Sequence, residues 1–396
     1  MKKAIVFGAG QIGRGFIGEL CFDSKYFIIF VDVDEKIVEL LNNSGNYTIY
    51  LLGEKKEEKI IYNFKSFNLG KDEKEIINEF VESEIVFTSV GAKNLFSLSK
   101  IIAKGIKERY KKGGSFLNIV ICENLLDAGE KLKREILNTG ILEDREIGYL
   151  NEKIGFVETV ISRMTSPLTD QEKKENPLLV KVEPYKILPV SKNDFKGKIP
   201  EIVGFLPVDN LHKYEELKLF GHNLSHVCLA YCGYLKGYTY IWQSIEDKEI
   251  FNLLLNVQKE VKEALIKKYD FKKEELENYF SDLNKRFDNK LLSDTVHRVG
   301  RDVLRKIGKN ERIVGAINLS LKNNLFPENI CFVLSCALCY NYSLDEESSK
   351  LQEILEKRGI DFVLRNICEI ENEQVLNRIK ENYWRLKDEG SSFKKY

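Results

Sequence analysis

The sequence GAGQIG at residues 8–13 constrains the fold of this chain more than any other feature. It follows a short apolar run at residues 3–7 and precedes a segment with helical periodicity, and the next apolar run, at 26–31, ends at Asp32. A G-x-G-x-x-G pattern that joins a strand to a helix, with an acidic residue after the second strand, is typical of a dinucleotide-binding βαβ unit. The chain is therefore expected to begin with a parallel sheet of the Rossmann type.

The chemistry of this turn favours NAD as the bound dinucleotide. The first glycine permits a tight turn, the second lets a pyrophosphate approach the backbone, and the third lets helix and strand pack closely. The helix N-terminus offers N–H groups and a positive dipole end to the phosphates. A carboxylate at Asp32 would accept hydrogen bonds from the adenosine ribose and repel the 2′-phosphate of NADP. Strand ends at the point where strand order reverses also line the ligand crevice, so the residues expected to contact NAD are Gly8, Gly10, Gln11, Ile12, Gly13, Asp32, Val90 and Gly91.

Strand-like and helix-like segments alternate through the first half of the chain. Apolar runs at 84–90 and 116–122 are separated by an amphipathic segment, which is the order expected of a doubly wound α/β fold. Beyond about residue 206 the strand signals give way to long segments with helical periodicity, such as 248–267. We predict a Rossmann-type NAD-binding domain at 1–205 and a mainly α-helical substrate and catalytic domain at 206–396.

The composition argues against several classes of protein. The 396 residues hold 61 Lys+Arg and 61 Asp+Glu, whereas nucleic-acid-binding proteins normally carry a basic excess. No apolar run reaches the ~20 residues that a membrane span needs. The eight cysteines lie mostly in apolar segments, and CFVLSCALC at 331–339 lacks turn residues, so we expect a core helix there rather than zinc ligands. We expect a cytoplasmic protein with reduced thiols, as a monomer or weak dimer.

The segment KLFGHNLSH, residues 218–226, is the strongest candidate for the chemistry. It holds two of the four histidines, His222 and His226, together with Lys218 and Asn223. At about 100° per residue, a helix places all four side chains on one side. Alcohol oxidation needs a base for the hydroxyl proton and donors for the developing alkoxide, and a lysine can act as the base when burial lowers its pKa. Because no His and Cys set has zinc spacing, we predict a metal-free reaction. A solvated amphipathic helix is the alternative.

Three motifs together resemble the polyol-specific long-chain dehydrogenases, the mannitol dehydrogenase family. They are MKKAIVFGAGQIGRGFIGEL at the N-terminus, CEN at 122–124, and K-x4-N-x2-H within 218–226. The resemblance runs through most of the chain and implies zinc-independent, NAD-linked oxidation of a secondary alcohol. The roles it implies are general acid/base for Lys218, donation to the reacting oxygen for Asn124 and Asn223, and placement of that oxygen for His226. As an alternative, Asn124 caps the helix that follows it.

Four arginines are candidates for binding a substrate phosphate, because guanidinium groups pair bidentately with phosphate oxygens. Arg298, Arg301 and Arg305 share one basic stretch, with the last two expected one helical turn apart, and Arg163 lies on a predicted loop. We therefore expect interconversion of a sugar alcohol phosphate and a keto sugar phosphate, such as mannitol 1-phosphate and fructose 6-phosphate. An unphosphorylated polyol or a hexuronate is the alternative, because Ser162 stands where the family often has an acidic residue. Outside the enzymes, the alternative is a non-catalytic NAD sensor.

Overall fold

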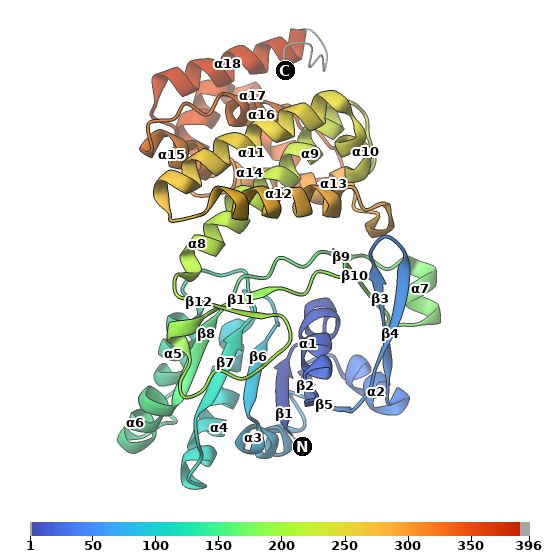
Figure 1. Cartoon of the computed structure of the whole chain (residues 1–396), viewed down its shortest axis with the longest axis vertical. Helices are drawn as coiled ribbons and strands as arrows, with labels where there is room; N and C mark the ends of the chain where they lie inside the picture. The colour runs from blue at the N-terminus through green and yellow to red at the C-terminus, as the bar shows by residue number, and fades with distance from the viewer. Residues whose placement is uncertain (1, 389–396) are drawn as a thin grey trace. The chain divides into compact units, whose positions relative to one another are not determined.

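A computed structural model describes residues 2–388 of the chain. The chain folds into two compact units, residues 1–214 (unit 1) and residues 215–396 (unit 2). Unit 1 combines strands and helices, and unit 2 is built from helices (Figure 1). The predicted fold class is confirmed. The boundary predicted after residue 205 precedes the observed division, which falls inside helix α8 (Leu211–Glu216).

A six-stranded parallel sheet in the order β5-β2-β1-β6-β7-β8 forms the centre of unit 1. This is the doubly wound arrangement, in which the strand order reverses between β1 and β6. The carboxyl ends of these two strands meet at the switch point, where ligands of such sheets bind. The strands are β1 (Lys3–Phe7), β2 (Phe27–Asp32), β5 (Phe64–Asn68), β6 (Ile85–Thr88), β7 (Leu117–Ile121) and β8 (Ile154–Glu158).

Both faces of this sheet are buried, which explains why its strands read as continuous apolar runs. Along β1, Ala4 and Val6 belong to one hydrophobic core, whereas Ile5 and Phe7 belong to the other. The first core is covered by η1 (Gly13–Ile17), α1 (Gly18–Asp23) and α2 (Glu35–Ser44). The second is covered by α3 (Glu73–Glu82), η2 (Leu95–Leu98), α4 (Ser99–Lys111), α5 (Ala128–Asn138) and α6 (Asp144–Lys153).

A smaller sheet, in the order β4-β3-β10-β9, packs against the first core. It packs closely on η1, because a Cβ atom on Gly15 would lie only 2.4 Å from the side chain of Val180 in β10. The remaining elements of unit 1 are β3 (Tyr47–Leu52), β4 (Lys56–Ile61), β9 (Thr165–Ser166), α7 (Asp170–Glu175), β10 (Val180–Val182), β11 (Leu188–Ser191), η3 (Lys192–Asp194) and β12 (Phe205–Val208).

Unit 2 is organised around helix α9 (Leu224–Leu235), which contacts α10, α11, α13 and α16. A helix that is apolar on all sides is stable only when it is buried, and α9 meets this condition. The apolar stretch 331–339 lies in the buried helix α16 (Glu328–Leu338) and its C-terminal cap, so the prediction of a core helix is confirmed. Within residues 2–388, none of the helices is both long enough and apolar enough to cross a membrane. The other helices are η4 (Leu217–Asn223), α10 (Ile241–Glu246), α11 (Lys248–Lys268), α12 (Lys273–Phe287), η5 (Lys290–Leu292), α13 (Val296–Gly300), α14 (Val303–Lys306), α15 (Val314–Lys322), α17 (Glu346–Phe362), η6 (Val363–Ile367) and α18 (Glu373–Asp388).

Candidate active site

The three fingerprint glycines do different work at the switch point of unit 1. Gly8 has a φ of +96°, and a Cβ atom there would lie 2.4 Å from the carbonyl oxygen of Ser89. A Cβ atom on Gly13 would lie 1.8 Å from the carbonyl oxygen of Gly8. The packing of the chain itself therefore requires these two glycines. A Cβ atom on Gly10 would meet no heavy atom of the described chain within 4 Å. Space above Gly10 fits the close approach of a dinucleotide pyrophosphate, which is the purpose of the second glycine in such turns.

Asp32 lies at the carboxyl end of β2 and already takes part in the geometry of the glycine turn. Its Oδ2 atom accepts a hydrogen bond from the backbone N–H of Ala9 at 2.6 Å, and its Oδ1 atom accepts one from Asp34 at 3.0 Å. An ionised carboxylate has about four acceptor positions, so both oxygens keep capacity for ribose hydroxyls. Asp32 thus combines a structural role with the predicted ribose contact.

Glu123, which follows β7, links the carboxyl end of that strand to the segment that follows β6. Its carboxylate accepts a hydrogen bond from the N–H of Val90 at 2.8 Å, while the Val90 carbonyl accepts one from Asn94 at 3.0 Å. Burial raises the pKa of Glu123, although the amides of Val90 and Gly91 bond to it. Both backbone polar groups of Val90 are therefore engaged within unit 1, and its predicted contact with NAD is limited mainly to packing.

Asn124 follows Glu123 in an exposed turn beyond β7. The alternative that it caps the next helix is wrong, because α5 begins at Ala128 and its N-cap is Asp127.

Lys218 and Asn223 lie in a π-helical segment, η4, rather than in a regular α-helix. In an α-helix, two side chains five positions apart point in different directions around the helix axis. In a π-helix, the backbone hydrogen bond joins residues i and i+5, so the same two side chains lie nearly above one another. The two side chains therefore lie closer to the same side of the helix than the periodicity of 100° per residue predicted. Single π-turns within helices are frequent at functional sites.

The environment of Lys218 makes its amine a base near neutral pH. Burial and the nearby Arg312 guanidinium lower the pKa of Lys218 from 10.5 to about 8, and Glu215 opposes the shift only in part. Both effects disfavour the charged ammonium form. A substantial fraction of the amine is therefore neutral and able to accept a proton at mildly alkaline pH.

His226 is held by a carboxylate and an aromatic ring. Its Nε2 atom lies 3.0 Å from Oδ2 of Asp294, and its ring stacks on Phe287 with centroids 4.8 Å apart. The other oxygen of Asp294 accepts a hydrogen bond from Nε of Arg298 at 2.7 Å. Burial alone would raise the pKa of Asp294, but His226 and Arg298 outweigh it and lower the pKa to about 2. Asp294 thus links a predicted catalytic residue to a predicted phosphate ligand.

His222 is buried and carries no charge at neutral pH. Burial lowers its pKa well below 6.5, and the nearby Arg286 guanidinium acts in the same direction. Its ring meets the ring of Phe287 edge-on, with centroids 5.4 Å apart. The imidazole therefore serves as a neutral packing partner of the same aromatic ring that His226 stacks on.

The basic stretch of unit 2 is not one continuous helix. Helix α13 ends at Gly300, and α14 begins at Val303, after Asp302 adopts a φ of +59°. The prediction that Arg301 and Arg305 lie one helical turn apart is therefore wrong. Arg305 is exposed and lies 3.0 Å from Glu311, whose second oxygen lies 3.2 Å from Arg312.

Arg163 does not have the predicted substrate role. Its side chain is 0% exposed and lies 2.6 Å from the equally buried Glu19. Its guanidinium also donates hydrogen bonds to the carbonyls of Gly15 and Glu183, at 2.9 and 2.7 Å. A group enclosed in this way cannot reach a substrate phosphate, because its charge is already neutralised inside unit 1.

The structure also reveals residues that the sequence did not identify. Asp294 is one, and a carboxylate four positions before Arg298 is the signal that could have found it. Arg312 and Glu123 offer no such local signal, since each acts on a partner distant in the sequence. Among residues 2–388, no group of three or more His, Cys, Asp or Glu side chains is placed to hold a metal ion.

Comparison with known proteins covers both units. Residues 2–204 match the mannitol dehydrogenase Rossmann domain, and residues 210–387 match the mannitol dehydrogenase C-terminal domain. The chain is 37% identical to the mannitol-1-phosphate 5-dehydrogenase of Caldanaerobacter subterraneus, over 98% of this chain and 99% of that protein. It is 36% identical to the enzyme of the same name from Bacillus subtilis, over 95% of this chain and 98% of that protein.

Solved structures agree at the level of the fold. A D-sorbitol dehydrogenase in substrate-free form has a TM-score of 0.83 at 16% identity, covering 98% of this chain and 94% of that one. Pseudomonas fluorescens mannitol 2-dehydrogenase, in a complex with NAD and D-mannitol, has a TM-score of 0.75 at 17% identity, covering 98% and 92%. With both of its domains matched and relatives of this identity along almost its whole length, the chain belongs to the mannitol dehydrogenase family.

Proposed function

We propose that this protein is an NAD-dependent, metal-independent dehydrogenase that interconverts mannitol 1-phosphate and fructose 6-phosphate. The observation that carries the proposal is Lys218, a partly buried lysine whose pKa of about 8 suits proton transfer near neutral pH. It stands in a chain that also keeps the complete dinucleotide fingerprint. The names of the relatives at 36–37% identity support the substrate.

In the oxidation direction, Lys218 accepts the proton of the substrate hydroxyl. Asn223 and Asn124 each donate a hydrogen bond to the oxygen on which negative charge develops, which stabilises the transition state. His226, held through Nε2 by Asp294, orients the same oxygen through its other ring nitrogen. Bound NAD would supply the hydride acceptor. In unit 1, Asp32 would hold the ribose, and the amides around Gly10 would face the pyrophosphate.

Arg298, Arg301 and Arg305 recognise the phosphate in this proposal. Arg305 has a side chain 53% exposed and shares Glu311 with Arg312. Replacing Arg305 with methionine leaves Glu311 paired with Arg312, so the local fold should be retained. Because hydrogen bonds to charged groups contribute about 1.5–3 kcal/mol, kcat/KM for fructose 6-phosphate should fall roughly tenfold to hundredfold. Turnover of fructose by the same variant is the control and should be unchanged.

The proposal is tested by following NADH oxidation with a panel of keto sugars. Fructose 6-phosphate should support turnover with a kcat/KM orders of magnitude above that of fructose. A preference for fructose or for a hexuronate would instead favour the alternative substrates. If no sugar phosphate, free ketose or hexuronate supports turnover, the protein is not an enzyme of this reaction.

The proposed setting is the cytoplasm, where cysteines stay reduced. All eight cysteines are free thiols, and seven of them are buried. A monomer or weak dimer remains the expected state, which sedimentation velocity measures directly.

A further inference from the structure

A π-helical segment lies near the start of the helix that follows the glycine loop. Residues Gly13–Ile17 form η1, and the amide of Gly18 bonds to the carbonyl of Gly13, five residues earlier. Such turns are rare compared with α-helical ones, so contacts from outside the helix are needed to favour this form. Two carbonyls of the turn receive them. The Arg14 carbonyl accepts a hydrogen bond from the hydroxyl of Tyr47 at 2.8 Å, and the Gly15 carbonyl accepts one from Nη1 of Arg163 at 2.9 Å.

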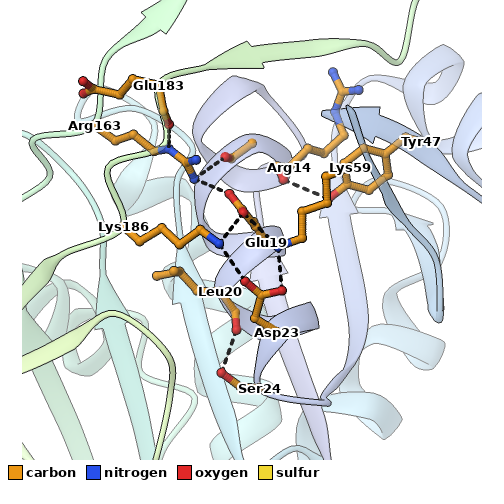
Figure 2. Close-up of polar contacts among 11 residues, drawn as sticks. Arg14, Glu19, Leu20, Asp23, Ser24, Tyr47, Lys59, Arg163, Glu183 and Lys186 are labelled. Atoms are coloured by element: carbon orange, nitrogen blue, oxygen red, sulfur yellow. Dashed lines mark hydrogen bonds and ion pairs between the residues drawn. The ribbon is translucent and has the colours of Figure 1, made fainter. Parts of the chain in front are cut away.

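A buried ion network holds Arg163 in this position, as Figure 2 shows. Glu19 is 0% exposed, and its carboxylate lies 2.6 Å from Arg163, 2.9 Å from Lys59 and 2.7 Å from Lys186. Asp23 pairs with the same two lysines at 2.6 and 2.9 Å. Burial alone would raise the pKa of Glu19, but the three cations outweigh it and the pKa lies below its ordinary value. The network therefore keeps Glu19 ionised and fixes Arg163 beside the π-turn.

The same turn is coupled to the glycine loop through Arg14. Its Nε atom donates a hydrogen bond to the Ala9 carbonyl at 2.6 Å, and its Nη1 atom donates one to the Leu178 carbonyl. Ala9 stands between Gly8 and Gly10, and its N–H is held by Asp32. The backbone that would face the pyrophosphate is thus tied on one side to Asp32 and on the other to the π-turn.

We infer that Tyr47 and Arg163 are positioning residues for the dinucleotide: by holding η1 in its π-helical form, they fix the glycine loop in the conformation that receives the pyrophosphate. The inference rests on the proposed binding of NAD. It gives a role in cofactor binding to two residues outside the fingerprint, one in β3 and one after β8.

Direct titration of NADH binding to the purified full chain, followed by fluorescence, tests the inference. Tyr47→Phe removes only the hydroxyl that bonds to Arg14. Because one neutral hydrogen bond contributes a small net free energy, the Kd of NADH should rise roughly twofold to tenfold. The matched control is Tyr149→Phe, which removes a hydroxyl that bonds to the Ser115 carbonyl at 3.0 Å, away from the fingerprint. This control should keep the wild-type Kd even if its melting temperature falls.

A second pair of variants examines the guanidinium group. Arg163→Lys keeps a positive charge beside Glu19 but lacks the planar fork that reaches the carbonyls of Gly15 and Glu183. Its control is Arg109→Lys, because Arg109 is also buried and donates hydrogen bonds to the carbonyls of Phe80 and Ser83 at 3.2 and 2.9 Å. The Kd of NADH should rise in the Arg163 variant alone. ADP-ribose, which contains the pyrophosphate but no nicotinamide, should lose affinity by the same factor as NADH.

Wild-type Kd values in both Tyr47→Phe and Arg163→Lys would overturn the inference while leaving the proposed function intact. Equal rises in the Tyr47 and Tyr149 variants would also overturn it, because the loss would then follow general stability. A wild-type protein that binds no NADH would refute the proposed function and this inference together.

Discussion

Of the π-helical segments among residues 2–388, one in each unit, η1 and η4, lies where function is expected, and the cations of these two segments have different neighbours. Around η1 in unit 1, every cation is matched by an acceptor: Arg14 by backbone carbonyls, and Arg163 by Glu19. Around η4 in unit 2, burial and the nearby Arg312 guanidinium lower the pKa of Lys218 to about 8. The contacts around η1 fix its backbone conformation, whereas the surroundings of η4 lower the pKa of its lysine.

The difference shows how the same rare backbone geometry serves two purposes. A binding loop needs one conformation, so compensated charges and hydrogen bonds around it are favourable. A lysine that acts as a general base needs a pKa near the working pH. Burial and a neighbouring positive charge lower its pKa, but the same surroundings would destabilise a lysine with a purely structural role. Arg163 and Lys218 both carry basic side chains in partly or fully buried places, and burial together with the charged neighbours decides which purpose each serves.

The largest effect on activity is expected from removing the amine of Lys218. Lys218→Met should lower kcat in both directions by roughly 10²–10⁴, the usual contribution of a general acid or base. The Kd of NADH, measured by fluorescence, should stay at the wild-type value, because η1 is untouched. Lys236→Met is the control, since this lysine pairs with Asp247 and Glu249 in the same unit; it should cost stability but not kcat. Near-normal kcat in folded Lys218→Met protein would remove the base assignment.

A smaller effect is expected at Asp294, which holds both His226 and Arg298. Asp294→Asn keeps the size of the side chain but removes the charge that both partners face. Since hydrogen bonds to charged groups contribute about 1.5–3 kcal/mol, kcat/KM should fall roughly tenfold to hundredfold, as steady-state kinetics would show. Asp247→Asn, which alters the N-cap of α11, serves as the stability control. If the Asp294→Asn variant were as active as that control, the catalytic role of His226 would not depend on a neighbouring carboxylate.

The smallest expected change is a shift in pH dependence. The Arg312 guanidinium disfavours the Lys218 ammonium, so Arg312→Met should move the pKa of Lys218 back toward 10.5. Oxidation needs the neutral amine, and its rate should therefore begin to rise at a higher pH in the variant than in the wild type. The measurement is the pH profile of kcat for oxidation. An unchanged midpoint would show that burial alone tunes the lysine.

Local signals in the sequence were sufficient to predict the strands and the glycine turn at which the cofactor is expected to bind. The apolar run at 3–7 became β1 with the same limits, and the glycines and Asp32 lie at the predicted strand ends. These features depend on residues close together in the chain, where turn chemistry and burial leave a direct pattern.

Features that depend on distant partners could not be predicted in this way. Glu19 and Arg163 are 144 positions apart, and nothing near Arg163 indicates a buried carboxylate. The regular period of 100° per residue also hides a π-turn, because the sequence of η4 differs little from that of an ordinary helix. The order of side chains around Lys218 was therefore only partly predicted, and Arg301 and Arg305 were placed on a single helix that the structure divides.

The pH profile of hydride transfer, measured as single-turnover oxidation of mannitol 1-phosphate from pH 6 to pH 10, tests the central claim most directly. The wild-type rate should increase through one ionisation near pH 8, as Lys218 loses its proton, and this ionisation should be absent from the residual rate of Lys218→Met. A wild-type profile that is flat across this range, or a midpoint near 8 that persists in the variant, would contradict the account.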